Sequence, residues 1–204
     1  MLFSTYFRAL SAGKKIALVA VFSALSIVVN VFSIDVGASN KIAFTYTVCF
    51  FAGCMLGGVP AFLVAFLGDT IGFFINAQGG VFWLFGVTLG IYALIMGAIM
   101  NVPFGKGRAA PYLKAAIAFA AGYLLITVGL NTVVNYWYAR IFFWGGQPNK
   151  TIGVYLAGRI GFQSVVYAVN VGVSMVLLPV MLHIGRPKAK HKKYDTAPQN
   201  EEKV

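Results

Sequence analysis

Acidic residues are scarce in this chain, and so are the side chains that most enzymes use for catalysis. Its 204 residues include five Asp and Glu, two His and two Cys. The histidines, His183 and His191, fall at the end of the last apolar segment and in the polar segment after it. Nucleophilic catalysis needs a nucleophile beside a base, and the apolar segments contain no such pair. No Walker A motif occurs either. We therefore expect no enzymatic activity.

Metal and cofactor sites are also not indicated. The two cysteines, Cys49 and Cys54, lie in one apolar run, without the CxxC spacing or the neighbouring histidine that a metal site would need. We interpret them as buried thiols, and we expect neither a metal nor a cofactor.

Long apolar runs dominate what is present. Hydrophobic residues make up 59% of the chain and charged residues 10%, with a mean hydropathy of +0.81. Roughly 20 apolar residues cross a membrane as a helix. The sequence thus predicts an all-α integral membrane protein, a compact bundle of six transmembrane helices formed by residues 1–185. The spans are expected at about 16–34, 42–57, 60–75, 81–102, 112–138 and 156–184. The third span is short, so we expect it to be packed inside the bundle or locally irregular. Residues 186–204 are expected to form a basic, disordered cytoplasmic tail.

The net charge of +11 is of a size found in nucleic-acid-binding proteins, but the basic residues lie between apolar runs and form no solvated patch. They are better interpreted as topology signals. Three precede the first span, three lie between the fourth and fifth, and six lie in the tail. The remaining four, Lys41, Arg140, Lys150 and Arg159, fall on the other side. We therefore expect both termini in the cytoplasm.

Polar residues in the predicted spans concentrate in the outer half of the membrane. Polar side chains in lipid usually face protein or water, so this asymmetry predicts a solute site that opens outward. The candidate substrate-binding residues are Asn30, Lys41, Phe44, Tyr46, Asp69, Trp83, Asn131, Asn135, Arg159, Gln163 and Asn170. Asn131 and Asn135 are one helical turn apart, and Arg159, Gln163, Tyr167 and Asn170 share one helical face.

Each of these residues also has a structural interpretation. Asn and Thr often bridge neighbouring membrane helices, Asp69 can pair with a cation or a backbone group, and Arg159 can extend to the interface. Two other functional classes stay open. A ligand-free membrane scaffold would tolerate apolar replacements, and an autonomous proton-coupled carrier would depend on Asp69.

The outer side combines cations with aromatic residues. Lys41, Arg140, Lys150 and Arg159 accompany aromatics that include Phe44, Phe82, Trp83, Tyr136, Trp137 and Trp144. A cationic rim with aromatic walls suits a planar, anionic solute.

Several motifs resemble those of the S components, the substrate-capture subunits, of energy-coupling-factor (ECF) vitamin transporters, over about residues 14–184. They are Ala20-Val-Phe-Ser-Ala24, the run from Phe51 to Pro60, Gly68-Asp-Thr-Ile-Gly72, and Leu156-Ala-Gly-Arg159. The stretches 33–41 and 76–79 look most like the folate group.

The resemblance implies a vitamin-binding subunit of an ABC-type importer in the cytoplasmic membrane of a bacterium. Folate would be the first solute to test, with riboflavin, pantothenate or a queuosine precursor as alternatives. The subunit would bind its vitamin from outside and deliver it through a transmembrane coupling protein driven by two ATPase subunits. Ala20 and Ala24 match the small-residue motif that contacts the coupling protein. Asp69 and Arg159 match recurring polar positions. The basic tail matches no motif of the family and would contact anionic lipid.

Overall fold

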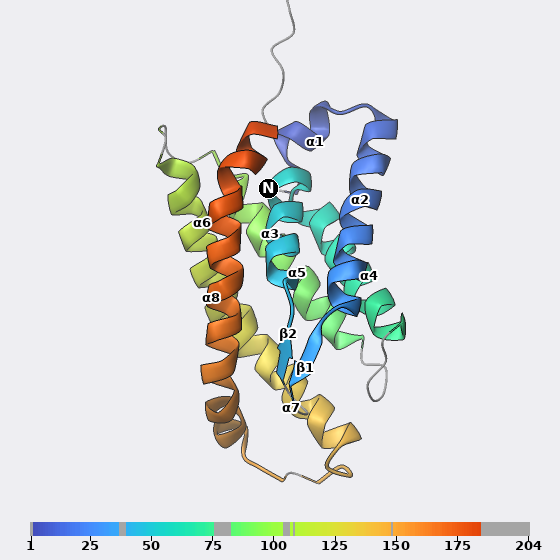
Figure 1. Cartoon of the computed structure of the whole chain (residues 1–204), viewed down its shortest axis with the longest axis vertical. Coiled ribbons are helices and arrows are strands. Elements are labelled where there is room, and N and C mark those ends of the chain that lie inside the picture. The colour runs from blue at the N-terminus through green and yellow to red at the C-terminus, as the bar shows by residue number, and fades with distance from the viewer. Residues whose placement is uncertain are drawn as a thin grey trace, which may run out of the picture.

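A computed structural model describes residues 2–36, 40–75, 83–103, 107, 109–147 and 149–184 of the chain. The described part is a bundle of helices with one small β-hairpin (Figure 1). Its elements are α1 (Thr5–Ala9), α2 (Ala12–Val31), β1 (Ile34–Val36), β2 (Asn40–Ile42), α3 (Thr45–Leu56), α4 (Gly58–Ile75), α5 (Leu84–Met100), α6 (Ala110–Ala121), the π-helix η1 (Gly122–Leu130), α7 (Asn131–Phe142) and α8 (Ile152–Ile184). The predicted tail, 186–204, lies outside the described residues.

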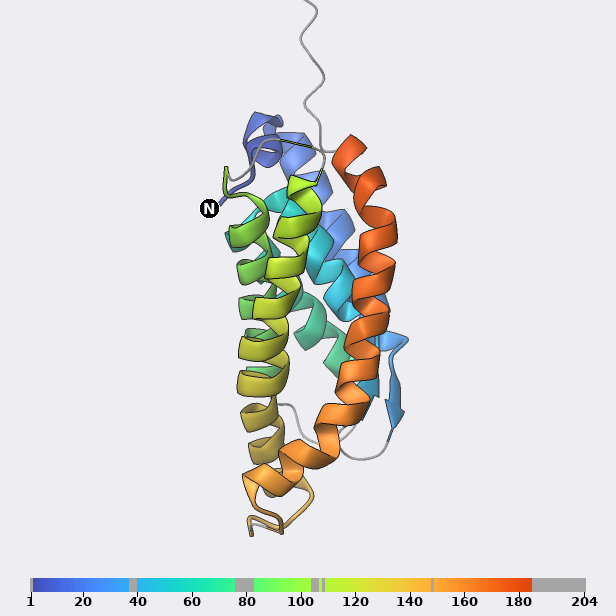
Figure 2. The same ribbon diagram turned by 90° about the vertical axis from the view of Figure 1, so that its left-hand side faces the viewer.

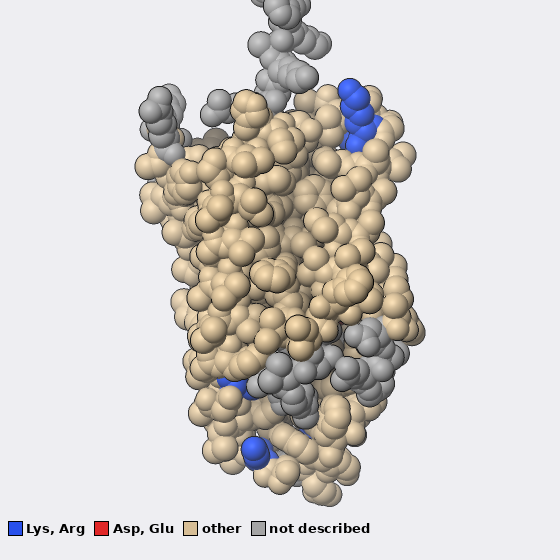
Figure 3. Space-filling model, viewed as in Figure 1, with Lys and Arg blue, Asp and Glu red and all other residues tan. Residues whose placement is uncertain are grey.

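The apolar helices follow the predicted spans in order. Ala12–Val31, Gly58–Ile75, Ala110–Phe142 and Ile152–Ile184 are each long and apolar enough to cross a membrane. Thr45–Leu56 and Leu84–Met100 are apolar but shorter. Figure 3 shows Lys and Arg near the two ends of one face and an uncharged band between them, as a membrane-embedded surface requires. The chain is thus a multi-helix protein suited to a membrane.

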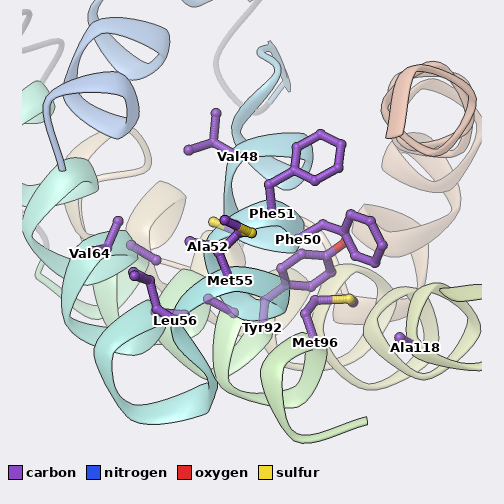
Figure 4. Close-up of a cluster of buried hydrophobic side chains, with 14 of the residues drawn as sticks. Val48, Phe50, Phe51, Ala52, Met55, Leu56, Val64, Tyr92, Met96 and Ala118 are labelled. Atoms are coloured by element: carbon purple, nitrogen blue, oxygen red, sulfur yellow. The ribbon is translucent and has the colours of Figure 1, made fainter. Parts of the chain in front are cut away.

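The shortest apolar helix, α3, forms the centre of the bundle. Ten of its 12 residues are buried, and at 1.5 Å per residue it is only about 18 Å long. Phe50 of α3 packs with Tyr92 and Met96 of α5, and all three are 0% exposed (Figure 4). The sequence assigned this enclosed position to the span at 60–75, but α4 there is regular and exposes Leu63, Leu67 and Ile71.

Helices α2 and α4 approach so closely that two glycines of α4 are required. A Cβ on Gly68 would overlap Ser26 Oγ, and one on Gly72 would lie 2.7 Å from Asn30 Cβ. Both neighbours are on α2. Close backbone approach through glycine is a common way to pack membrane helices, and here it brings Asn30 next to Asp69.

The first long helix is shorter than predicted. Helix α2 ends at Val31 instead of near residue 34, because the backbone N–H and hydroxyl of Ser33 both donate to Asn30 O, at 3.2 and 2.6 Å.

Three elements were not predicted: the β-hairpin, the π-helix η1 and the short helix α1. The chain then forms the antiparallel hairpin β1–β2, in which Ile34 pairs with Ile42. The fifth span contains the π-helical η1 between α6 and α7, and the three form one continuous column beside α8 (Figure 2).

The third unpredicted element, α1, belongs to an N-terminal hook that closes the α3–α4 junction. Ser4 donates from its backbone N–H to Leu56 O at 3.1 Å and from its hydroxyl to Met55 O at 2.5 Å. The junction residue Gly57 has φ +94° and ψ 179°, a conformation that is essentially restricted to glycine. A Cβ there would also lie 2.5 Å from Ser4 N.

We therefore expect Gly57→Ala to destabilise the protein by at least about 2 kcal/mol, from backbone strain and the displaced hook. Thermal unfolding in detergent measures this change. Gly13→Ala is the matched control, because no atom lies within 4 Å of the position that its Cβ would occupy, and its melting temperature should be equal to or above that of the wild type. A Gly57→Ala protein as stable as wild type would contradict the role of the hook.

Candidate functional site

The first predicted pair, Asn30 and Asp69, joins α2 to α4. Asn30 is 4% exposed, and its Nδ2 donates to Asp69 Oδ1 at 2.9 Å and to Gly68 O at 3.5 Å. These bonds give both residues a structural role. Their assignment as substrate-binding residues stays a prediction.

Arg159 lies inside the bundle near the start of α8. It is 5% exposed, and its Nη1 donates to Asn131 O at 3.4 Å. Its guanidinium lies over the ring of Tyr155, 5.7 Å from the centroid, while its Nε is buried without a hydrogen-bond partner. The ionisable groups near its charge are the phenols of Tyr155 and Tyr46, and no carboxylate among the described side chains is one of them. Arg159 therefore does not extend to the interface, contrary to the alternative interpretation.

Asn131 and Asn135 are joined as their spacing predicts. Asn135 Nδ2 donates to both Asn131 Oδ1 and Asn131 O at 2.8 Å. The backbone carbonyl of Asn131 thus accepts from both Asn135 and Arg159, so α7 and α8 are connected at this point.

Tyr46 reaches the same place from α3. Its hydroxyl faces the side chains of Thr127 and Asn131 and lies in the field of the Arg159 charge. Its ring packs against those of Tyr92 and Tyr167, at centroid distances of 4.9 and 5.1 Å. The hydroxyls of Tyr92 and Tyr167 are 3.2 Å apart, and Tyr167 donates to Phe119 O at 2.7 Å. These contacts fix the direction of the Tyr46 hydroxyl.

The four residues Tyr46, Thr127, Asn131 and Arg159 are called the Arg159 cluster below. They come from α3, η1, α7 and α8. Thr127 was not among the predicted residues, because a lone threonine in an apolar run gives no signal of its own. Its spacing to Asn131 and Asn135, four and eight residues, was the pattern that could have indicated it.

The predicted polar face of α8 is confirmed as a buried face. Arg159, Gln163, Tyr167 and Asn170 are each at most 8% exposed. Asn170 is occupied structurally, since its Nδ2 donates to Ala43 O and Val166 O, both at 2.9 Å. Its Oδ1 accepts from Thr47 N at 3.1 Å and Thr47 Oγ1 at 3.0 Å. Asn170 thus holds the start of α3 against α8.

Three predicted residues are exposed or have side chains that the structure does not describe. Phe44 precedes α3 and is 48% exposed, and Trp83 precedes α5 and is 59% exposed. Lys41 pairs with Asp35 in the hairpin register, but its side chain is outside what the structure describes.

An aromatic group lies beside the Arg159 cluster. The rings of Tyr136, Trp144 and Tyr155 contact one another at centroid distances of 5.6 to 5.7 Å. Tyr136 and Trp144 were predicted as part of the outer aromatic walls. Tyr155 also contacts the Arg159 guanidinium. A cation therefore lies next to aromatic rings, which is the combination that binding of a planar anion requires.

The predicted coupling residues lie on the outer surface of the bundle, away from the Arg159 cluster. Ala20 and Ala24 are both exposed on α2, whereas Phe22, Ser26 and Asn30 are the buried residues of that helix. The alanine face is thus open to a partner helix or to lipid.

Comparison with known proteins gives a family and a fold. The family model for the S component of ECF-type riboflavin transporters matches residues 11–183. A crystal structure of FolT bound with folic acid superposes with a TM-score of 0.63 at 18% identity, covering 80% of this chain and 92% of that one. Comparison with curated proteins gives no match.

Proposed function

Since this chain belongs to the ECF-type riboflavin transporter S component family, we propose that it captures a folate-like, anionic vitamin at the Arg159 cluster. An S component is a substrate-binding subunit, and the chain is therefore not an enzyme, as its sequence predicts. The structural neighbour that binds folic acid supports the choice of vitamin.

The observation that carries the proposal is the buried guanidinium of Arg159. A buried charge without a counter-ion is costly, and one that is paired and hydrogen-bonded is tolerated. Before the tail, the sequence holds two acidic residues, Asp35 and Asp69. Asp69 is bound by Asn30, and the Asp35 side chain is not described. A solute that brings its own negative charge would complete the site.

Charge distinguishes folate from riboflavin. Folic acid carries two carboxylates and a planar ring, so it can pair with Arg159 and stack on the aromatic group of Tyr136, Trp144 and Tyr155. Riboflavin has a planar ring but no acid group. It remains the second candidate, because the matching family model is described for riboflavin.

Delivery completes the proposal. All six apolar helices would cross the cytoplasmic membrane of a bacterium, with both termini in the cytoplasm. The first described residues and the end of α8 lie at one end of the bundle (Figure 1), which supports an even number of crossings.

Residues 1–185 would form the binding domain, and the basic tail would contact anionic lipid. The exposed Ala20–Ala24 face would dock on a coupling protein driven by two ATPase subunits.

Thermal unfolding of the detergent-purified chain with a panel of vitamins tests the capture step. A ligand that binds only the folded state stabilises it by about 2.7 kcal/mol at a hundredfold excess over Kd. We expect this shift with folic acid, and none with thiamine, a cation. A shift with riboflavin alone would keep the family function and overturn the solute. No shift with any vitamin would favour a ligand-free scaffold.

A further inference from the structure

Two buried side-chain atoms in the Arg159 cluster, Thr127 Oγ1 and Arg159 Nε, lack a hydrogen-bond partner. Four such side-chain atoms occur among the described residues: Ser26 Oγ, Thr70 Oγ1, Thr127 Oγ1 and Arg159 Nε. The first two belong to α2 and α4, where Gly68 and Gly86 pack against them. Thr127 and Arg159 instead come from η1 and α8 and both lie near the Tyr46 hydroxyl, which faces the Thr127 side chain. They are 3% and 5% exposed. Unpaired polar groups of this kind are rare in native proteins, and two beside one hydroxyl indicate a missing partner.

The π-helical segment explains why the Thr127 hydroxyl is unoccupied. A threonine in a regular helix usually bonds to a carbonyl of the preceding turn. Thr88 does so in α5, donating to Phe85 O at 2.8 Å. Thr127 lies within η1, where the wider turn alters this geometry, and its own carbonyl accepts from Thr132 Oγ1 at 3.4 Å. π-helical segments inside α-helices often occur at functional sites.

The groups that converge here can all donate a hydrogen bond. Arg159 is a donor only, and the hydroxyls of Thr127 and Tyr46 can each donate. The side-chain oxygen of Asn131 accepts from Asn135 Nδ2 at 2.8 Å, and its amide nitrogen supplies two further N–H donors. A guanidinium whose neighbouring side chains can each donate suits an oxyanion, and a carboxylate matches the guanidinium best.

We propose that Tyr46, Thr127, Asn131 and Arg159 form a carboxylate subsite, in which Thr127 is a specificity-determining residue. The acid group of the solute binds at this buried position, and its ring lies toward Tyr155 and the aromatic group. This assignment rests on the proposed function, because it names the part of the vitamin that the cluster recognises.

Folic acid and its dimethyl ester test the subsite, because they share a ring system and differ in charge. Calorimetric titration of the full chain should give an affinity for the ester lower by about 100-fold or more. Thr127→Val removes the hydroxyl at nearly constant volume and should weaken folic acid about tenfold, while leaving the ester unchanged. Thr127→Ser should retain binding. Thr88→Val, which removes a buried hydroxyl already bonded within its own helix, should also retain it.

The results distinguish failure of the carboxylate subsite from failure of the proposed vitamin. Equal affinity for acid and ester, or a Thr127→Val effect that is the same for both, overturns the subsite while capture of folate stands. If folic acid does not bind, the proposed vitamin fails. The subsite is then tested with 4-aminobenzoylglutamate and its neutral diamide at millimolar concentration. Stabilisation of the wild type by the acid alone, lost in Thr127→Val, supports it. No stabilisation overturns it.

Discussion

Replacement of Arg159 by methionine is expected to weaken folic acid binding by about 100-fold or more, because loss of one partner of a buried ion pair costs roughly 3 kcal/mol. The solute carboxylate would enter a site that has lost its cation. Methionine preserves most of the volume of the arginine stem, and the guanidinium makes a single long hydrogen bond, to Asn131 O at 3.4 Å. The substitution should therefore change the affinity for folic acid far more than it changes the packing of the protein.

The same substitution should leave the unliganded protein as stable as wild type or more so. Replacing buried charge by apolar volume is often neutral or stabilising, and Arg159 has no counter-ion among the described side chains. Lys14→Met is the control, since Lys14 is exposed on α2 and does not belong to the predicted cationic rim, and its loss should change affinity less than about threefold. Full affinity in Arg159→Met, or loss of folding together with binding, would show that the residue is structural.

Enlargement of both Ala20 and Ala24 to leucine is expected to abolish uptake while leaving vitamin binding unchanged. Both alanines are exposed on α2, and small residues one turn apart let a partner helix approach closely. Leucines would separate the backbones and remove the close contact. The buried residues of α2, which include Asn30, are on the other side of the helix, so the site itself is not touched.

A matched pair exists on another helix. Ala116 and Ala120 of α6 have the same spacing and are also exposed, so their double replacement by leucine controls for greater bulk in the membrane. Uptake of labelled folic acid is measured in cells that contain the coupling protein and its ATPases, and binding is measured on purified protein. Equal loss of uptake in both double variants would contradict a specific coupling face on α2.

The sequence predicted the helices well, because an apolar run long enough to cross a membrane has few other stable structures. It also predicted the polar face of α8, since the spacing of Arg159, Gln163 and Asn170 fixes their common side. It did not predict that α2 would end early or that α3 would be the enclosed helix. Those features depend on the Ser33 bonds to Asn30 O and on packing between distant segments.

Site residues were harder to predict than the fold, because a polar residue looks the same in sequence whether or not its bonds are filled. Asn170 and Arg159 were selected by one argument. The structure then fills the hydrogen bonds of Asn170 and leaves Arg159 Nε without a partner. The spacing of Thr127 to Asn131 could have indicated its position, but its lack of a hydrogen-bond partner depends on the π-helical segment, which local propensity does not encode. Which polar residues belong to the site could therefore be decided only from their hydrogen-bond partners in the structure.

The most direct measurement is calorimetric titration of the purified full chain with folic acid, followed by the same titration with riboflavin. We expect saturable binding of folic acid at one site per chain, with riboflavin bound at least about tenfold more weakly because it leaves Arg159 unpaired. Tight binding of riboflavin without binding of folic acid would contradict the central claim that the buried guanidinium selects an anionic vitamin.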